Sequence, residues 1–132
     1  MQKTVEFSID VTGDTTQKRF TGAFAAKVSL SVREVLKEDE IRRSILGAQP
    51  KEADPYQLSI ARAIAYLTVR LTESPDWWRA SNNGLDSEDE NVLAAVHNTC
   101  VAEVNKAYEA LSKKAEAARA DLKKVEADLT GK

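Results

Sequence analysis

Residues 54–78 read DPYQLSIARAIAYLTVRLTESPDWW, and this stretch decides the fold. Asp54 is a residue that caps helix N-termini well, and Pro55 suits the first helical position. Apolar residues then recur at helical spacing on more than one face, which is typical of a helix buried at the centre of a domain. Pro75 disfavours helix in the residue before it, so we expect the helix to end at Ser74. The stripe comprises Leu58, Ala61, Ile64, Ala65, Thr68 and Leu71, and Ile60, Leu67 and Val69 lie off it.

The composition is that of a soluble globular protein with one domain. The chain has 132 residues, of which 42% are hydrophobic and 30% are charged. That mix supports a packed core and argues against disorder. The formal net charge of -2 gives no bulk attraction to nucleic acid or to a membrane, so we expect neither as a partner. The N-terminal stretch MQKTVEFSID lacks the apolar core of a secretory signal, and no apolar run reaches the ~18 residues of a membrane span.

Two N-terminal stretches alternate apolar and polar residues, which indicates half-buried strands. They span residues 5–11 and 20–30, and turn-forming Gly13 lies between them. We expect a hairpin at about residues 4–30, in which Gly22 marks a bulge or a close backbone approach. Because an isolated hairpin is marginal in water, its apolar face must pack on helices or its edge must pair with another chain.

The segment after the hairpin predicts short helical pieces. Ser31 and Glu34 fit a capping box, so a short helix should begin there. Asp39 is expected to cap a further helical turn, which Gly47 ends. Residues 48–53 (AQPKEA) then form a polar connection to the central helix.

Trp77 and Trp78 follow the end of the central helix directly. In the structural interpretation, one tryptophan closes the core and the other is partly exposed. In the functional interpretation, the pair forms a partner-binding surface, because Trp is over-represented among interface anchors. The two interpretations are compatible, since adjacent residues point in different directions.

A long helix is predicted near the C-terminus. Residues 87–90 (SEDE) fit a second capping box, and strong helix formers continue over residues 88–129. Such a helix would be about 60 Å long at ~1.5 Å per residue, so its end should project from the body or fray. We therefore expect a globular domain over residues 1–112, with its helices from about residue 32, and a helical extension over residues 113–132. A seam of coiled-coil type comprises Leu111, Ala115, Ala118, Leu122, Val125 and Leu129.

The sequence carries no catalytic or metal-binding constellation. His97 is the only histidine and Cys100 the only cysteine, so a zinc site lacks ligands. His97 is interpreted as a surface or boundary residue, and Cys100, on the apolar stripe of the long helix, as a small core hydrophobe. The acidic residues at 86–90 suit a helix N-terminus and lack the spacing of a calcium loop. We expect a protein that is not an enzyme and needs no cofactor.

Several stretches, in this order, resemble one protein family. They are FTGAF at 20–24, DEIRRSILG at 39–47, PDWW at 75–78, and GL at 84–85 leading into DENVL at 89–93. Their order, their spacing and the chain length resemble the tail assembly chaperones of long-tailed bacteriophages (siphoviruses). The resemblance spans roughly residues 5–110.

This resemblance implies a small, largely helical protein without catalytic or metal-binding residues. Family members act in the cytoplasm of the infected bacterium and are absent from the mature virion. They bind the tape measure protein and keep it soluble until the tail tube protein polymerises around it, so the tail tube protein is a further candidate partner. Many members are also made in a longer form by ribosomal frameshifting, and Gly131-Lys132 can be encoded by the slippery sequence GGG-AAA.

These observations together predict an α+β fold, mainly α, with a small N-terminal β-hairpin, a central buried helix and a long C-terminal helix. An alternative function from another class is a structural head-tail connector or tail completion protein of the virion. We also expect head-to-tail self-association, because head-to-tail contacts can propagate along a lengthy client. The expected partner-binding or self-association residues are Phe20, Phe24, Trp77, Trp78, Leu111, Leu122, Val125 and Leu129.

Overall fold

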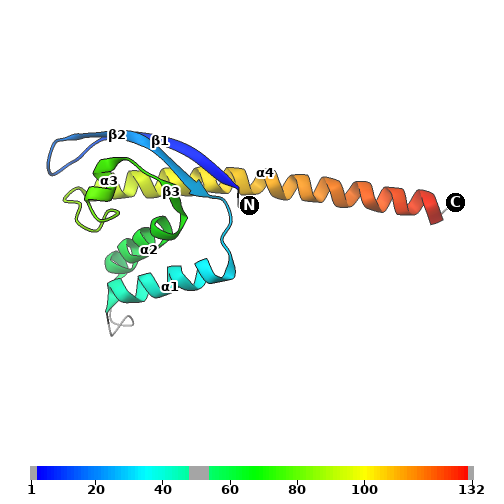
Figure 1. The fold of residues 1–132 in the computed structure, drawn as a ribbon, viewed down its shortest axis with the longest axis horizontal. Helices are drawn as coiled ribbons and strands as arrows, with labels where there is room; N and C mark the ends of the chain where they lie inside the picture. The colour runs from blue at the N-terminus through cyan, green and yellow to red at the C-terminus, as the bar shows by residue number, and fades with distance from the viewer. Residues whose placement is uncertain (1–2, 48–53, 131–132) are drawn as a thin grey trace.

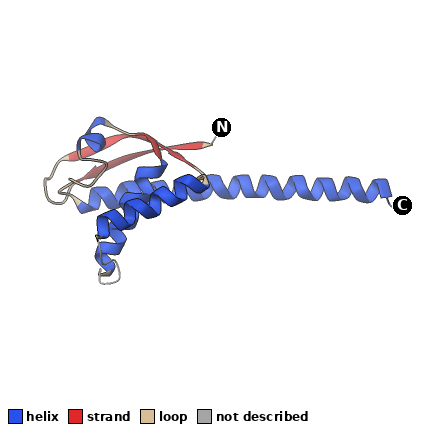
Figure 2. Cartoon of the chain, turned by 60° about the horizontal axis from the view of Figure 1, so that its bottom comes forward, coloured by secondary structure: helices blue, strands red, loops and turns tan. Residues whose placement is uncertain are grey.

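The fold is α+β, with a three-stranded sheet covering one side of a group of helices (Figure 1, Figure 2). The computed structural model describes residues 3–47 and 54–130, and the side chains of residues 128–130 lie outside this description. The architecture confirms the predicted fold class. The elements are β1 (Thr4–Thr12), β2 (Arg19–Lys27), α1 (Val32–Leu46), α2 (Pro55–Arg70), β3 (Leu71–Glu73), α3 (Asp76–Ala80) and α4 (Glu90–Thr130).

The sheet has the strand order β1-β2-β3, and both of its pairings are antiparallel. The predicted hairpin is confirmed, because β1 pairs with β2 from Thr4 opposite Lys27 to Thr12 opposite Arg19. Strand β2 ends at Lys27, although the alternation of apolar residues continues to residue 30. Beyond that point the chain leaves the sheet and turns toward α1 (Figure 1).

The central helix ends earlier than the sequence predicts, because strand β3 follows it directly. In the sequence, the helical spacing of apolar residues continues through Leu71. The helix ends at Arg70, and Leu71 is extended, with φ -67° and ψ 124°. Leu71 and Glu73 pair with Ala26 and Ala25 of β2, with an irregularity between the two pairs. This pairing joins residues far apart in sequence, so a local periodicity cannot reveal it.

Helix α1 is one helix of 15 residues, whereas the sequence predicts two short pieces. Its predicted start is confirmed, because Ser31 and Glu34 form a capping box. The prediction that Asp39 caps a new turn is wrong. The Asp39 carboxylate instead pairs with Arg42 and Arg43, one turn later, and such pairs stabilise a continuous helix.

The junction between α1 and α2 follows the predicted end and start signals. Helix α1 ends at Leu46, and the residue that caps it, Gly47, has a φ of 82° that suits glycine. The polar connection predicted for residues 48–53 lies outside the described residues. Helix α2 then begins at Pro55, and Asp54 caps it in a capping box with Gln57.

Helix α2 is the central helix of the fold, as predicted. It lies between α1 and α4 and also contacts β2 (Figure 1). Several of its buried residues are alanines, whose small side chains allow neighbouring elements to approach closely. Its buried residues are Ala61, Ala63, Ile64, Ala65 and Leu67.

The hydrophobic core lies between the sheet, α2 and the first part of α4. Burying a large apolar side chain in such a core stabilises the fold by about 1.5–3 kcal/mol. Helix α3 adds one tryptophan to this core. The largest fully buried apolar side chains are Trp78, Phe24, Ile64, Leu67, Val28, Val92, Val96 and Cys100.

Helix α4 is packed at its start and projects at its end. Its first part packs on β1, and its last buried residue among those described is Val104. The rest extends away from the sheet and the other helices (Figure 1, Figure 2). At about 1.5 Å per residue, the 41 residues of α4 span about 60 Å. The division into a domain over residues 1–112 and an extension over residues 113–132 stays a prediction.

The start of α4 differs from the predicted capping box. The helix begins at Glu90, and the Ser87 hydroxyl accepts a 3.2 Å hydrogen bond from the Asp89 N–H rather than from Glu90. The Asp89 carboxylate faces the β1–β2 turn. It accepts hydrogen bonds from the N–H groups of Thr15 (2.8 Å) and Thr16 (2.9 Å) and from the Thr16 hydroxyl (2.7 Å). An acidic residue that suits a helix N-terminus therefore attaches the hairpin turn to α4.

Candidate partner-binding surface

Two of the aromatic residues expected to bind partners are core residues. Phe24 and Trp78 are each 1% exposed, and their rings meet edge to face at 5.9 Å. Phe24 also stacks on Phe7, with ring centroids 5.1 Å apart. Rings buried to this extent offer no surface to a partner, so the structure assigns Phe24 and Trp78 to the core.

Trp77 and Phe20 form a partly exposed aromatic pair. Their ring centroids lie 4.9 Å apart, and the Trp77 Nε1–H donates a 2.9 Å hydrogen bond to the carbonyl of Thr21. The prediction that one of the two tryptophans closes the core while the other stays partly exposed is confirmed. The sequence predicts a bulge or a close backbone approach at Gly22. The β1–β2 register continues regularly through Gly22, and its close neighbour is the side-chain ring of Pro75.

The predicted seam residues lie far from this aromatic pair, on the projecting part of α4 (Figure 1). Leu111 is half-buried, whereas Leu122 is 63% exposed and Val125 is 54% exposed. The side chain of Leu129 lies outside the described residues. The predicted site residues therefore belong to the core and to two separate surfaces.

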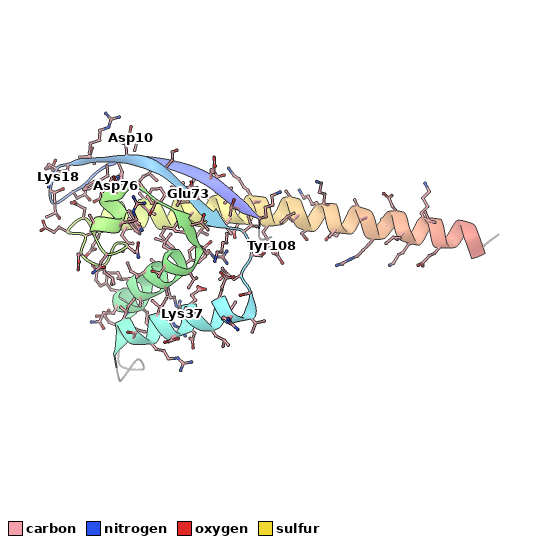
Figure 3. All side chains as sticks on the ribbon, in the orientation of Figure 1. Asp10, Lys18, Lys37, Glu73, Asp76 and Tyr108 are labelled. Carbon is pink, nitrogen blue, oxygen red and sulfur yellow. The ribbon has the colours of Figure 1, made fainter. Side chains whose placement is uncertain are left out.

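A further surface, which the sequence analysis missed, is an open groove between α1 and α4. Two adjoining cavities of about 470 Å³ and about 450 Å³ share the residues Val35, Glu38 and Tyr66. The first cavity reaches His97 of α4, and the second reaches Tyr108, near the base of the projecting part of α4 (Figure 3). We call these two cavities together the α1–α4 groove.

Helix α1 exposes large apolar side chains, of which Val35 lines this groove. Val35, which lines both cavities, is 52% exposed, and Tyr108 is 59% exposed. Val32 and Leu36 on the same helix are 79% and 64% exposed. No residue of α1 is buried. Large exposed apolar side chains often mark interaction sites, and the i, i+3, i+4 spacing of Val32, Val35 and Leu36 is the sequence signal that could have indicated them.

The floor of the groove is built from aromatic rings and one arginine. The Arg70 guanidinium lies 4.6 Å from the centre of the Tyr66 ring and donates hydrogen bonds to the carbonyls of Lys27 (2.9 Å) and Val28 (3.1 Å). Tyr66 meets His97 edge to face at 5.3 Å. Burial raises the pKa of Tyr66 to about 12 and lowers the pKa of His97. Both rings are therefore uncharged near neutral pH and contribute apolar surface.

The two residues with reactive side chains on α4 have the structural positions predicted for them. Cys100 is fully buried, and burial raises the pKa of its thiol to about 11, so the thiolate is disfavoured. His97 is half-buried, which matches the predicted boundary position.

Within residues 3–47 and 54–130, no group of three or more His, Cys, Asp or Glu residues is placed to hold a metal ion. Among the same residues, no helix combines the length and the apolar character that crossing a bilayer requires. Comparison of the chain with models of known families, with curated proteins and with solved structures finds no match.

Proposed function

We propose that this chain is a chaperone of phage tail assembly, and that it binds an apolar helical segment of the tape measure protein in the α1–α4 groove. The observation that carries the binding mode is the groove itself, in which Val35, Tyr66 and Tyr108 contribute apolar surface. The choice of the tape measure protein as the client rests on the sequence resemblance to tail assembly chaperones.

A groove between helices suits an amphipathic helix as its occupant. Such a helix places apolar side chains at i, i+3, i+4 and i+7 into the groove and keeps its polar face in water. Helix α1 forms one wall of the groove, and none of its residues is fully buried. Charged residues also line the groove, among them Glu38 and Arg42.

The proposed cycle takes place in the cytoplasm of the infected bacterium. Bound chaperone covers apolar segments of the tape measure protein and prevents their aggregation. The tail tube protein then replaces the chaperone as it polymerises around the same client. The chaperone is consequently absent from the mature virion.

Co-expression of this chain with the tape measure protein of the same phage tests the proposal. We expect the wild-type chain to increase the soluble fraction of the client and to be captured with it. Val35→Glu places a charge in the groove and should abolish both effects. Val32→Glu is the matched control, because Val32 lies on the same helix but lines neither cavity. A client whose solubility is the same with and without the chain would contradict the proposal.

Purified virions test the location of the protein. Absence of the chain from virions, with its presence in lysates of infected cells, is the result expected for an assembly chaperone. Stoichiometric presence in virions would support the head-tail connector or tail completion protein instead.

A further inference from the structure

The second cavity of the α1–α4 groove, of about 450 Å³, carries one positive charge on a mostly apolar lining. Arg70, the last residue of α2, is the only basic residue among the described residues that line it. The apolar and aromatic part of the lining includes Val35, Val101 and Tyr108. A cation in such surroundings is costly unless an acceptor or an opposite charge compensates it.

The Arg70 guanidinium is held in one orientation. It lies 4.6 Å from the centre of the Tyr66 ring, and its Nη1 donates hydrogen bonds to the carbonyls of Lys27 (2.9 Å) and Val28 (3.1 Å). Because both acceptors are neutral, these bonds orient the guanidinium and leave its charge uncompensated. A side chain fixed in this way loses little conformational entropy when a ligand binds to it.

The other two nitrogen atoms of Arg70 lack an acceptor. Nε is buried and has no hydrogen-bond partner. Both hydrogen bonds from Arg70 to described residues come from Nη1, so Nη2 donates none of them. Since Nε is buried, Nη2 is the remaining donor that a group in the cavity can reach. A half-buried guanidinium with two unused nitrogen atoms is unusual in a native protein.

No carboxylate of the described chain neutralises Arg70. The ion pairs within residues 3–47 and 54–130 all involve other basic residues. Glu38 lines the same cavity, but its carboxylate forms no ion pair with Arg70. The cavity therefore presents an oriented positive charge to whatever occupies the groove.

From this unpaired and oriented cation, we infer that the α1–α4 groove selects client helices that place a Glu or Asp side chain among their groove-facing apolar residues. The carboxylate of that residue accepts a hydrogen bond from the Arg70 Nη2. This inference rests on the proposed function, because it names the chemistry of the client segment that the same groove accepts. A carboxylate suits the site better than a neutral acceptor, since charge-assisted hydrogen bonds are about twice as strong and strengthen further away from water.

Fluorescence anisotropy with pairs of labelled helical peptides from the tape measure protein tests the inference on the unmodified chain. One peptide of each pair has a Glu or Asp on its apolar face, and its twin has Gln or Asn at that position. We expect the acidic peptide to bind about tenfold more tightly than its neutral twin. In the matched control pair, the acidic residue that is neutralised lies on the outer, polar face of the peptide, and the two affinities should be nearly equal.

Variants of Arg70 assign the preference to its guanidinium. Arg70→Gln should abolish the difference between the acidic peptide and its neutral twin. Arg33→Gln is the matched control, because it removes the same charge from α1 at a position that lines neither cavity, and it should keep the difference. Circular dichroism establishes that Arg70→Gln stays folded despite the lost hydrogen bonds to Lys27 and Val28. The comparison of twins on wild type needs no variant of the chain.

Glu38 gives a test of opposite sign. Its carboxylate lines the cavity that the carboxylate of the client enters, so the two repel each other. We expect Glu38→Gln to increase the preference for the acidic peptide over its neutral twin. A smaller preference in this variant overturns the inference.

The outcomes separate this inference from the proposed function. Peptides that bind wild type and lose affinity for Val35→Glu, but bind equally well in acidic and neutral form, overturn the inference and leave the proposed function in place. An equal preference for the acidic peptide in wild type and Arg70→Gln also overturns the inference. If no peptide binds wild type, the proposed function fails and the inference fails with it.

Discussion

The carboxyl group of Asp89 occupies the space that a β-carbon on Gly13 would need. This close approach attaches the β1–β2 turn to the start of α4. Asn91 strengthens the attachment, because its Nδ2–H donates a 2.8 Å hydrogen bond to the Thr12 carbonyl and its Oδ1 accepts a 2.9 Å hydrogen bond from the Asp14 N–H. The hairpin is therefore fixed at its turn as well as by its apolar face.

Asp89 should make stability depend on acid pH. Hydrogen bonds from the Thr16 N–H, the Thr16 hydroxyl and the Thr15 N–H hold the pKa of Asp89 below its usual 3.8. The stabilisation is complete above pH 3.8 and is lost as the pH falls through the lowered folded-state pKa. We expect Asp89→Asn to lower the midpoint of urea unfolding at neutral pH. The further decrease of this midpoint at acid pH should be smaller in the variant than in the wild type. The control is Asp10→Asn, which breaks only the exposed pair with Arg19, and an equal loss in both variants would contradict the attachment.

The two tryptophans should differ in their contribution to stability. Trp78→Ala removes a fully buried indole from the core and should cost about 3–5 kcal/mol of unfolding free energy. Trp77→Ala removes a partly exposed ring and one hydrogen bond and should cost clearly less. Urea unfolding followed by circular dichroism measures both losses. Equal losses would show that Trp77 is a core residue like Trp78. Neither indole would then be available to bind a partner.

Gly22 should not tolerate a methyl group. A β-carbon at this position would overlap the Pro75 ring, which is held next to Trp77. We expect Gly22→Ala to lower the unfolding free energy by about 1–3 kcal/mol, the usual cost of overpacking. Ala23→Val is the control on the adjacent, exposed position of the same strand, where a β-branched residue is well tolerated. An unchanged denaturation midpoint for Gly22→Ala would show that β2 and the segment around Pro75 can separate.

His97 should add a second pH dependence, nearer to neutral. Burial lowers the pKa of His97 below 6.5, so the unfolded chain binds this proton at higher pH than the folded chain does. Stability is therefore complete above pH 6.5 and declines as the pH falls through the folded-state pKa. We expect His97→Gln to remove this decline in urea unfolding measured across that range. The same decline in the variant would show that His97 is not its source.

Much of the local structure could be predicted because its signals are local. Ser31 and Asp54 cap their helices through side chains only three residues away, and Gly47 ends α1 through its own backbone conformation. The start of α4 shows the limit of such signals. Asp89 suits a helix N-terminus in sequence, but its carboxylate bonds to a turn more than 70 residues away.

The candidate surfaces were harder to predict than the fold. Alternation along β2 marks Phe20 and Phe24 as equivalent, yet Phe24 is buried whereas Phe20 stays partly exposed beside Trp77. The α1–α4 groove depends on how three helices are placed relative to one another, and no single stretch of sequence encodes that placement. Strand β3 escaped prediction for the same reason, since its pairing partner Ala26 is far away in sequence.

Direct binding to the α1–α4 groove tests the central claim. The measurement is fluorescence anisotropy of labelled helical peptides from the tape measure protein, titrated with purified wild-type chain, Val35→Glu and Val32→Glu. We predict saturable binding by wild type, a loss of about tenfold or more in affinity for Val35→Glu, equivalent to about 1.4 kcal/mol, and little change for Val32→Glu. Wild-type protein that binds none of the peptides, or equal losses for the two variants, would contradict the account.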